Sequence, residues 1–169
     1  AAYEKMLTLT RLAFPTVSIE AFEVTHSYCP GTYDLSINGK KFAGIAQRRI
    51  KNGISVMMYV SVNGAQQTRG QAMKRFYQEA LKEDFGTNGY PAVVPESMAT
   101  LADLLETPLT IEDVKQQFQL ALTQLYGESR SVDALCWKEA HVTSEQWTDQ
   151  INRMEERNKL KELADDYSL

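Results

Sequence analysis

The chain has 169 residues, of which 43% are hydrophobic and 24% charged, and its formal net charge at pH 7 is −4. This length and composition suit a globular domain that buries a core, and they exclude a low-complexity chain. No apolar run approaches the roughly 20 residues that a membrane-spanning helix needs. The first residues also lack the basic region and apolar stretch of a secretion signal, so a cytoplasmic protein is expected.

The charges are unevenly distributed along the chain. Between Leu35 and Gln78 there is no Asp or Glu, so all 22 acidic residues lie elsewhere. Eight basic residues lie within this segment: Lys40, Lys41, Arg48, Arg49, Lys51, Arg69, Lys74 and Arg75. A patch of one sign attracts an oppositely charged macromolecule. The segment therefore predicts either an acidic partner or an ordinary solvated face.

The N-terminal part predicts a helix followed by a strand. Apolar residues recur at helical spacing from Glu4 to Ala13, and Pro15 ends the helix because the residue before a proline disfavours helical backbone. Residues 19–25 then alternate imperfectly between apolar and polar side chains, as in a strand. This strand leads into a Cys-Pro-Gly sequence.

The sequence Cys29-Pro30-Gly31-Thr32 is a corner that carries a thiol. Proline suits the second position of a turn and glycine the third, where a type II turn needs a positive φ. The amides of Gly31 and Thr32 are then expected to be free to hydrogen-bond an oxyanion, whereas Pro30 has no N–H. Taken alone, the corner indicates a surface thiol more readily than a nucleophile.

A β-hairpin follows this corner. Asn38-Gly39 separates residues 33–37 from residues 40–45, and this dipeptide favours a type I′ turn, in which both central residues need a positive φ. Three apolar side chains of the hairpin are expected to share the face that packs in the core: Leu35, Ile37 and Phe42.

Lys41 has two interpretations. In the hairpin register it lies opposite Ser36 and diagonal to Asp34, where a surface ion pair would be worth about 0–1 kcal/mol. In the other interpretation its ammonium lies near Cys29, twelve positions earlier, and favours the thiolate, the form that attacks carbonyl carbon. Because seven extended residues span roughly 20 Å, the Cys-Pro-Gly loop must fold back over the sheet for this second arrangement.

Helices dominate after one more strand at residues 54–62. Thr68 is expected to cap a helix that runs to Leu81 and packs along an apolar stripe. That stripe consists of Ala72, Met73, Phe76, Tyr77, Ala80 and Leu81.

Two further helices are predicted from their capping residues. The first starts with a capping box that Thr110 and Asp113 form, and it ends near Gly127. The second begins at Thr143 or Ser144 and continues through residue 154.

The order of elements predicts an α+β fold with a mixed or antiparallel sheet and packed helices, because strands come first and helices follow. Glycine and proline cluster at residues 85–91 and mark a boundary. We therefore expect residues 1–90 to form the strand-bearing part of a catalytic domain and residues 91–169 to form a helical C-terminal portion.

Two motifs resemble the biotin/lipoate protein ligase and octanoyltransferase superfamily. They are Cys-Pro-Gly-x-Tyr-Asp-Leu-Ser-Ile at residues 29–37 and Gly-Lys-Lys-Phe-Ala-Gly-Ile-Ala-Gln-Arg-Arg at residues 39–49. Within the superfamily, the resemblance is to the amidotransferases that move octanoyl groups from the glycine cleavage H protein to other lipoyl domains. The superfamily's lysine precedes an apolar residue, a small residue and a glycine, which selects Lys41 rather than Lys40.

The resemblance implies a mechanism and a set of partners. Cys29 would attack an octanoyl-lysine amide on the H protein and hold the acyl group as a thioester. A lysine in the lipoyl domain of a dehydrogenase E2 subunit would then accept it. Lys41 would stabilise the thiolate, and Gly31 and Gly44 would lie against the substrate. Neither a metal nor a cofactor is implied, and acidic carrier domains would suit the basic segment.

The family pattern is incomplete in this chain. Members carry a further N-terminal stretch, with strands and an Arg-Arg-x-x-Gly-Gly-like segment, which this sequence does not contain. The resemblance therefore covers only the C-terminal part of the catalytic domain, and residues 1–169 alone are expected to be inactive.

Other interpretations remain open at this point. His26 precedes Cys29 by three residues and would suit a Cys-His hydrolase, whereas Cys136 is expected to be a buried thiol. The two cysteines and two histidines have no metal-ligand spacing. An octanoyl-acyl carrier protein transferase and an ATP-dependent lipoate ligase share the fold, and a nucleic-acid-binding module would use the basic segment without catalysis.

Overall fold

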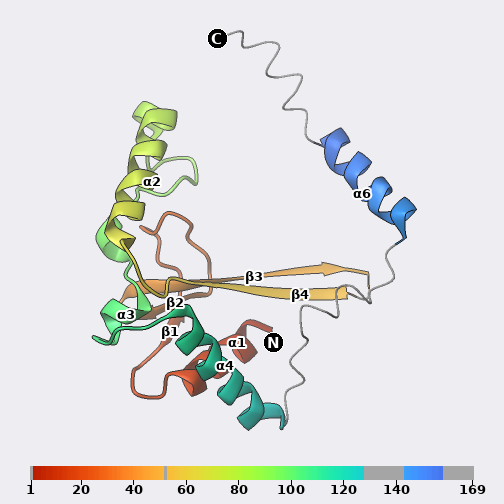
Figure 1. The fold of residues 1–169 in the computed structure, drawn as a ribbon. Helices are drawn as coiled ribbons and strands as arrows, with labels where there is room; N and C mark the ends of the chain where they lie inside the picture. The colour runs from red at the N-terminus through yellow and green to blue at the C-terminus, as the bar shows by residue number, and fades with distance from the viewer. Residues whose placement is uncertain (1, 52, 128–142, 158–169) are drawn as a thin grey trace. The chain divides into compact units, whose positions relative to one another are not determined.

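The computed structural model describes residues 2–51, 53–127 and 143–157 (Figure 1). Contacts divide the chain into two compact units, residues 1–129 and residues 130–169. In the second unit the structure describes helix α6 (Ser144–Arg157), whose start at Thr143 and Ser144 is confirmed. Thr143 and Gln146 cap this helix, each side chain bonding the other residue's amide. Cys136 lies outside the described residues.

The first unit contains a four-stranded antiparallel sheet. Its strands are β1 (Glu20–Phe22), β2 (Asp34–Ile37), β3 (Lys40–Ile50) and β4 (Gly53–Val60), and they lie in sequence order. The α+β fold class and each of the four expected strands are confirmed. Strand β1 is shorter than predicted and β3 is longer. A parallel contact is also present, as an isolated bridge between Lys41 and Met98.

The hairpin of β2 and β3 forms around the predicted turn. Asn38 and Gly39 have φ angles of 51° and 75°, as a type I′ turn requires. Ser36 pairs with Lys41 as expected, but the register then shifts between Leu35 and Ser36. Beyond this bulge, Asp34 pairs with Gly44. The sequence did not predict the bulge, which inserts one extra residue into β3.

Helices α1 (Ala2–Ala13) and α4 (Ile111–Tyr126) pack against each other on one side of the sheet (Figure 1). The helix predicted from Glu4 to Ala13 is therefore confirmed. The buried core joins these helices to β2 and β3, and it includes the three hairpin residues expected there. Its members are Leu7, Ala13, Phe14, Ile19, Leu35, Ile37, Phe42, Ala43, Leu101, Val114 and Ala121.

The predicted capping box at the start of α4 is confirmed. The hydroxyl of Thr110 accepts the Asp113 amide at 3.1 Å, and the Asp113 carboxylate accepts the Thr110 amide at 2.8 Å. Hydrogen bonds from the side chain and backbone of Thr110 lower the pKa of Asp113 below its ordinary value. Gly127, with a φ of 77°, ends the helix as expected.

Helix α2 (Gln66–Leu81) differs from its prediction in two ways. It follows Ala65 without a side-chain cap, and Thr68 lies inside its first turn, so the predicted cap is wrong. The predicted apolar stripe is also only partly a packing surface within the described residues, because Met73, Tyr77 and Leu81 are half-buried, whereas Phe76 is 61% exposed. The helix instead buries Gln66 and Gly70, near its N-terminus.

Residues 93–101 return to the sheet after the glycine-rich turn at residues 85–91. The amide of Ala99 donates to the carbonyl of Lys41 at 3.0 Å, and the amide of Leu101 donates to the carbonyl of Ser61 at 2.7 Å. Three short helices lie between α2 and α4: η1 (Lys82–Asp84) precedes the turn, and η2 (Pro95–Ser97) and α3 (Leu101–Leu104) follow it. These contacts place residues 93–101 in the same compact unit as the strands. The division into a catalytic part at residues 1–90 and a helical portion at residues 91–169 stays a prediction.

Among the described helices, none has the length and apolar character needed to cross a bilayer.

The contact between α2 and η2 yields a stability prediction. Alanine in place of Gly70 would gain about 1 kcal/mol in helix propensity. However, its Cβ would lie 2.8 Å from the Cβ of Pro95 and 3.0 Å from the Cα. Overpacking of this kind costs about 1–3 kcal/mol, so we expect Gly70→Ala to lower the free energy of unfolding, as measured by urea denaturation.

A matched control lies on the same helix. Ala72 is exposed, and Ala72→Gly should cost about 1 kcal/mol through propensity alone. If Gly70→Ala proved more stable than the wild type while Ala72→Gly behaved as expected, the tight contact with Pro95 would be refuted.

Candidate active site

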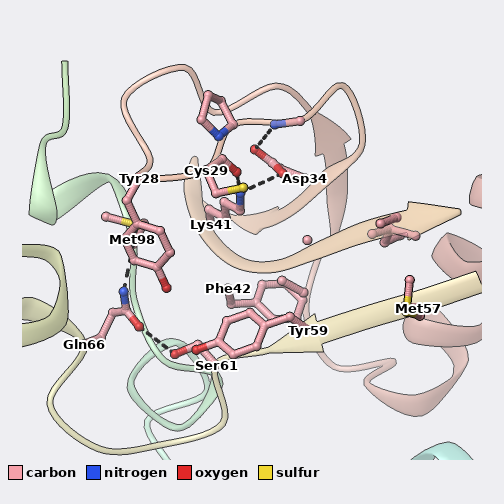
Figure 2. Close-up of a pocket in the computed structure, with 16 residues that line it drawn as sticks. Tyr28, Cys29, Asp34, Lys41, Phe42, Met57, Tyr59, Ser61, Gln66 and Met98 are labelled. Carbon is pink, nitrogen blue, oxygen red and sulfur yellow. Dashed lines mark hydrogen bonds and ion pairs between the residues drawn. The ribbon is translucent and has the colours of Figure 1, made fainter. Parts of the chain in front are cut away.

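A cavity of about 510 Å³ opens beside the β2–β3 hairpin, between the Cys-Pro-Gly loop and β4 (Figure 2). Its wall contains all four of the site residues predicted from the sequence. The full lining is Tyr28, Cys29, Pro30, Gly31, Asp34, Lys41, Phe42, Ala43, Gly44, Ile45, Ala46, Met57, Tyr59, Ser61, Gln66 and Met98. Most of these side chains are apolar, and the polar ones fall into two groups.

The first polar group is built on a buried ion pair. Lys41 Nζ lies 2.8 Å from Asp34 Oδ1, and the two side chains are 10% and 2% exposed. Asp34 is thus the partner that the sequence predicted for Lys41, but the predicted surface position of the ion pair is wrong because both side chains are buried. The bulge and the overlying loop bury both charges, so their interaction is screened far less than at the surface.

The Cys-Pro-Gly loop folds back over the sheet, as the second interpretation of Lys41 requires. The Lys41 ammonium donates a hydrogen bond to the backbone carbonyl of Cys29. It also donates to Ser27 Oγ at 3.3 Å, and Ser27 is fully buried. Three acceptors thus surround Lys41 Nζ and match its three N–H donors.

The loop is also tied to Asp34. The second carboxylate oxygen, Oδ2, accepts the amides of Gly31 at 3.1 Å and Val24 at 3.2 Å. The Gly31 amide is therefore not free, and its predicted role as an oxyanion donor is wrong. Gly31 also lacks a positive φ, so the predicted type II turn is wrong as well. The Thr32 amide donates no hydrogen bond to another described residue and stays the candidate donor.

Cys29 is a free and exposed thiol. Figure 2 shows its side chain next to Lys41 at one end of the cavity, with Asp34 beyond them. The Lys41 ammonium hydrogen-bonds the backbone carbonyl of Cys29, so an accessible thiol and a buried cation line one end of the cavity. The structure thus brings Cys29 and Lys41 together, and their catalytic roles stay predictions.

Gly44 provides space next to the ion pair. A Cβ built at this position would lie 3.6 Å from Lys41 Cε and 3.8 Å from Asp34 Oδ1, which is ordinary contact. Larger side chains would compete with Lys41 for the same volume. Gly44 and Gly31 both line the cavity, and their contact with a substrate stays a prediction.

The second polar group was not predicted from the sequence. Gln66 is 3% exposed, and its Oε1 accepts hydrogen bonds from Ser61 Oγ and Arg69 Nη2, both at 2.8 Å. Figure 2 shows Gln66 and Ser61 away from Cys29 and Lys41, with the ring of Tyr28 on the Gln66 side of Lys41 and the ring of Tyr59 beside Ser61. Burial raises the pKa of Tyr28 above its ordinary value. A glutamine in the first turn of a helix has no sequence feature that would predict a buried hydrogen-bond group at the cavity wall.

The alternative base, His26, does not line the cavity. Its Nδ1 lies 3.3 Å from the carbonyl of Ala92, and the amide of Val94 donates to the His26 carbonyl at 2.9 Å. These contacts give His26 a place in loop packing and offer nothing in favour of a Cys-His hydrolase. Within the described residues, no three His, Cys, Asp or Glu side chains cluster as metal ligands do.

Residues 1–123 match the model of the lipoyl protein ligase A/B catalytic domain. The chain belongs to this family. It is also similar to proteins named octanoyl-[GcvH]:protein N-octanoyltransferase. The relative from Exiguobacterium sibiricum is 44% identical over 160 residues, which cover 94% of this chain and 57% of the relative.

Two other relatives of the same name agree with this assignment. The Macrococcus caseolyticus protein is 42% identical over 167 residues, which cover 95% of this chain and 58% of that protein. The Lysinibacillus sphaericus protein is 44% identical over 128 residues, which cover 75% of this chain and 46% of that protein. The resemblance inferred from the two motifs is thereby confirmed. The chain spans about half the length of these relatives.

The contrast between Lys41 and Lys40 provides a prediction. Lys40 is exposed at the turn, whereas Lys41 is buried beside Cys29. We expect Lys41→Met to raise the pH at which alkylation of Cys29 is half-maximal, because the thiolate loses its neighbouring cation. Lys40→Met should leave that pH unchanged. The measurement is the iodoacetamide rate against pH, followed by mass spectrometry of the Cys29 peptide.

Lys41→Met also leaves the Asp34 carboxylate buried without its partner, so a thermal melt must first show that the variant is folded. A profile that moves in Lys40→Met and stays fixed in folded Lys41→Met would show that the wrong lysine has been chosen.

Proposed function

We propose that this protein transfers an octanoyl group from a lysine of the glycine cleavage H protein to lysines in the lipoyl domains of 2-oxoacid dehydrogenase subunits. One observation supports the proposal: the exposed thiol of Cys29 and the buried ammonium of Lys41 line the same mostly apolar cavity, and the ammonium donates a hydrogen bond to the backbone carbonyl of Cys29. The names of the similar proteins agree with it. This chemistry needs no metal and takes place on carrier proteins without a membrane or a nucleic acid.

The reaction proceeds in two exchanges at one carbonyl carbon. The Cys29 thiol gives up its proton, the thiolate attacks the octanoyl-lysine amide, a C–S bond forms, and the C–N bond breaks as the donor lysine takes up that proton and leaves as an amine. The acceptor amine then attacks the thioester, forms a new C–N bond and breaks the C–S bond, and the proton that it loses returns to the displaced thiolate. One amide is consumed and one is made, so the net exchange is close to neutral in free energy and requires no nucleotide.

Lys41 acts as a fixed positive charge in both exchanges. Its three N–H groups are directed to Asp34, Ser27 and the Cys29 carbonyl. It therefore stabilises the thiolate by charge, since no donor remains for a direct hydrogen bond to sulfur. For Lys41 to pass a proton to a leaving amine, one of these contacts must first open.

The cavity suits the octanoyl chain. Its volume is in the range of small-molecule sites, and Phe42, Ile45 and Met57 contribute apolar wall. Burial of the six methylenes of an octanoyl group would contribute roughly 5 kcal/mol at about 0.8 kcal/mol for each methylene. This gain would keep the alkyl chain of the thioester inside the cavity between the two exchanges.

The proposal is tested by transfer between purified carriers. The full-length protein is incubated with octanoylated H protein and an unmodified lipoyl domain, without ATP, and the intact masses of all three are followed. We expect the lipoyl domain to gain one octanoyl group, and Cys29→Ser to abolish this gain because a hydroxyl is a far weaker nucleophile. Transfer by Cys29→Ser at the wild-type rate would refute the thioester step.

The same assay separates the related enzymes. Transfer that occurs only from octanoyl-acyl carrier protein would identify the first alternative, and transfer from free octanoate that requires ATP would identify a ligase. Salt-sensitive oligonucleotide binding without any transfer would identify the nucleic-acid-binding module.

The basic end of the β3–β4 hairpin, formed by Arg48 and Arg49 of β3 and by Lys51 after it, is proposed to meet the carrier. These three side chains are exposed, and none forms an ion pair with a described residue. The surrounding segment from Leu35 to Gln78 holds no acidic residue. Such a surface raises the encounter rate with an acidic carrier and contributes less to the bond-breaking step.

We therefore expect Arg48→Gln/Arg49→Gln to raise KM for the octanoylated carrier several-fold at low salt with little change in kcat. The difference from wild type should shrink as salt screens these exposed charges. Lys74→Gln/Arg75→Gln on α2 removes the same charge elsewhere in the basic segment and is the matched control. Equal effects of both double variants would show that net charge matters and the position of the hairpin end does not.

A further inference from the structure

One carboxylate, Asp34, holds both partners of the candidate catalytic pair. Its Oδ1 binds the ammonium of Lys41 at 2.8 Å, and its Oδ2 accepts the amides of Gly31 and Val24 at 3.1 and 3.2 Å. The side chain is 2% exposed. Asp34 thus joins strand β3, which carries the lysine, to the loop that carries Cys29.

The contacts of Lys41 complete this arrangement from the other side. Its ammonium donates to the Cys29 carbonyl and to Ser27 Oγ, which belong to the same loop. The loop therefore bonds to Asp34 through its amides and to Lys41 through its oxygens. If the Asp34 contact is removed, the ammonium loses its charged partner and the loop loses two anchors.

We propose that Asp34 is the positioning residue of this site: it holds the Lys41 ammonium in a fixed place beside the Cys29 backbone, and it holds the Cys29 loop over that ammonium. Its importance for acyl transfer rests on the function proposed above. Its effect on the thiol is separate from that function, because it can be read without any acyl donor.

The direction in which the pH of Cys29 alkylation moves distinguishes the positioning role from two simpler roles of Asp34. As a nearby negative charge alone, Asp34 would disfavour the thiolate, so its neutralisation would move alkylation of Cys29 to lower pH. As the residue that holds Lys41 in place, Asp34 favours the thiolate, and its loss moves alkylation to higher pH. A purely structural Asp34 would change the melting temperature and leave the alkylation profile where it is.

Asp34→Asn is the most direct variant because it keeps the shape of the side chain. An amide has one acceptor oxygen and one donor nitrogen. Whichever way it turns, a donor faces either the Lys41 ammonium or the amides of Gly31 and Val24. One of the two anchors is therefore lost, and the negative charge is lost in both orientations.

The experiment measures the iodoacetamide rate at Cys29 against pH in the full-length protein. We expect Asp34→Asn to raise the half-maximal pH by about one unit or more. It should also slow octanoyl transfer roughly ten- to a hundredfold, since small misplacements of reacting groups have effects of this size. A half-maximal pH that is lower than wild type, or unchanged, would overturn the proposal.

A milder variant covers the case in which Asp34→Asn does not fold. In Gly31→Ala the new Cβ would lie 3.3 Å from Asp34 Oδ1, the oxygen that binds Lys41, and both charges remain. Gly31 does not have a positive φ, so alanine fits the backbone. We expect a smaller shift in the same direction, and an unchanged profile in this variant would also overturn the proposal.

Ser36→Ala is the matched control. Ser36 is fully buried on the same strand, and its Oγ has no hydrogen-bond partner among the described residues. A profile shift in Ser36→Ala as large as that in Asp34→Asn would show a general disturbance of β2 and overturn the proposal.

The Lys41→Met background tests whether Asp34 acts through the lysine. If it does, Asp34→Asn should raise the half-maximal pH in the wild type and not in Lys41→Met, a non-additivity typical of contacting residues. Equal upward shifts in both backgrounds would overturn the proposal. If the wild type transfers no octanoyl group while these profiles behave as expected, the proposed function fails and the positioning role of Asp34 stands.

Discussion

The site depends on the need to neutralise two buried charges. A carboxylate and an ammonium removed from water are tolerated only as a close, fully hydrogen-bonded pair, and removing one partner of such a pair typically costs about 3–5 kcal/mol. Asp34 and Lys41 meet this requirement with the help of groups from the Cys29 loop. The loop conformation and the ion pair therefore stabilise each other. The position of Cys29 is fixed by the hydrogen bond from Lys41 to its carbonyl and by the bond from the nearby Gly31 amide to Asp34.

The strand geometry makes this pair possible. Without the bulge between Leu35 and Ser36, Asp34 would face residue 43, and Ala43 is part of the core. With the bulge, Asp34 faces Gly44, where the absence of a side chain leaves space for the Lys41 ammonium. A local irregularity of this kind commonly re-aims side chains next to functional sites. In this hairpin the bulge brings the side chains of Asp34 and Lys41 into contact, whereas a regular register would place the two residues only diagonally.

The sequence predicted the features that depend on local interactions. The turn at Asn38-Gly39, the capping box at Thr110 and the core positions of the hairpin all follow from neighbouring residues. The burial of Lys41, the engagement of the Gly31 amide and the group around Gln66 depend on contacts between distant segments. Family resemblance named Cys29 and Lys41, but neither periodicity nor spacing revealed Asp34 as their common anchor.

The exposure of the two proposed catalytic groups differs for a physical reason. The sulfur of Cys29 is accessible, and this suits a reaction in which lysines on two separate protein domains must reach it in turn. Lys41 is buried, so in the proposed reaction its charge would be screened less by water and salt than the charge of a surface lysine. If both groups were exposed, solvent would weaken the activation of the thiol. If both were buried, the carrier lysines could not enter. A buried cation close to an accessible thiol would meet both requirements of the proposed reaction. Asp34 offsets the free-energy cost of burying the Lys41 charge, because its carboxylate neutralises that charge and is itself buried.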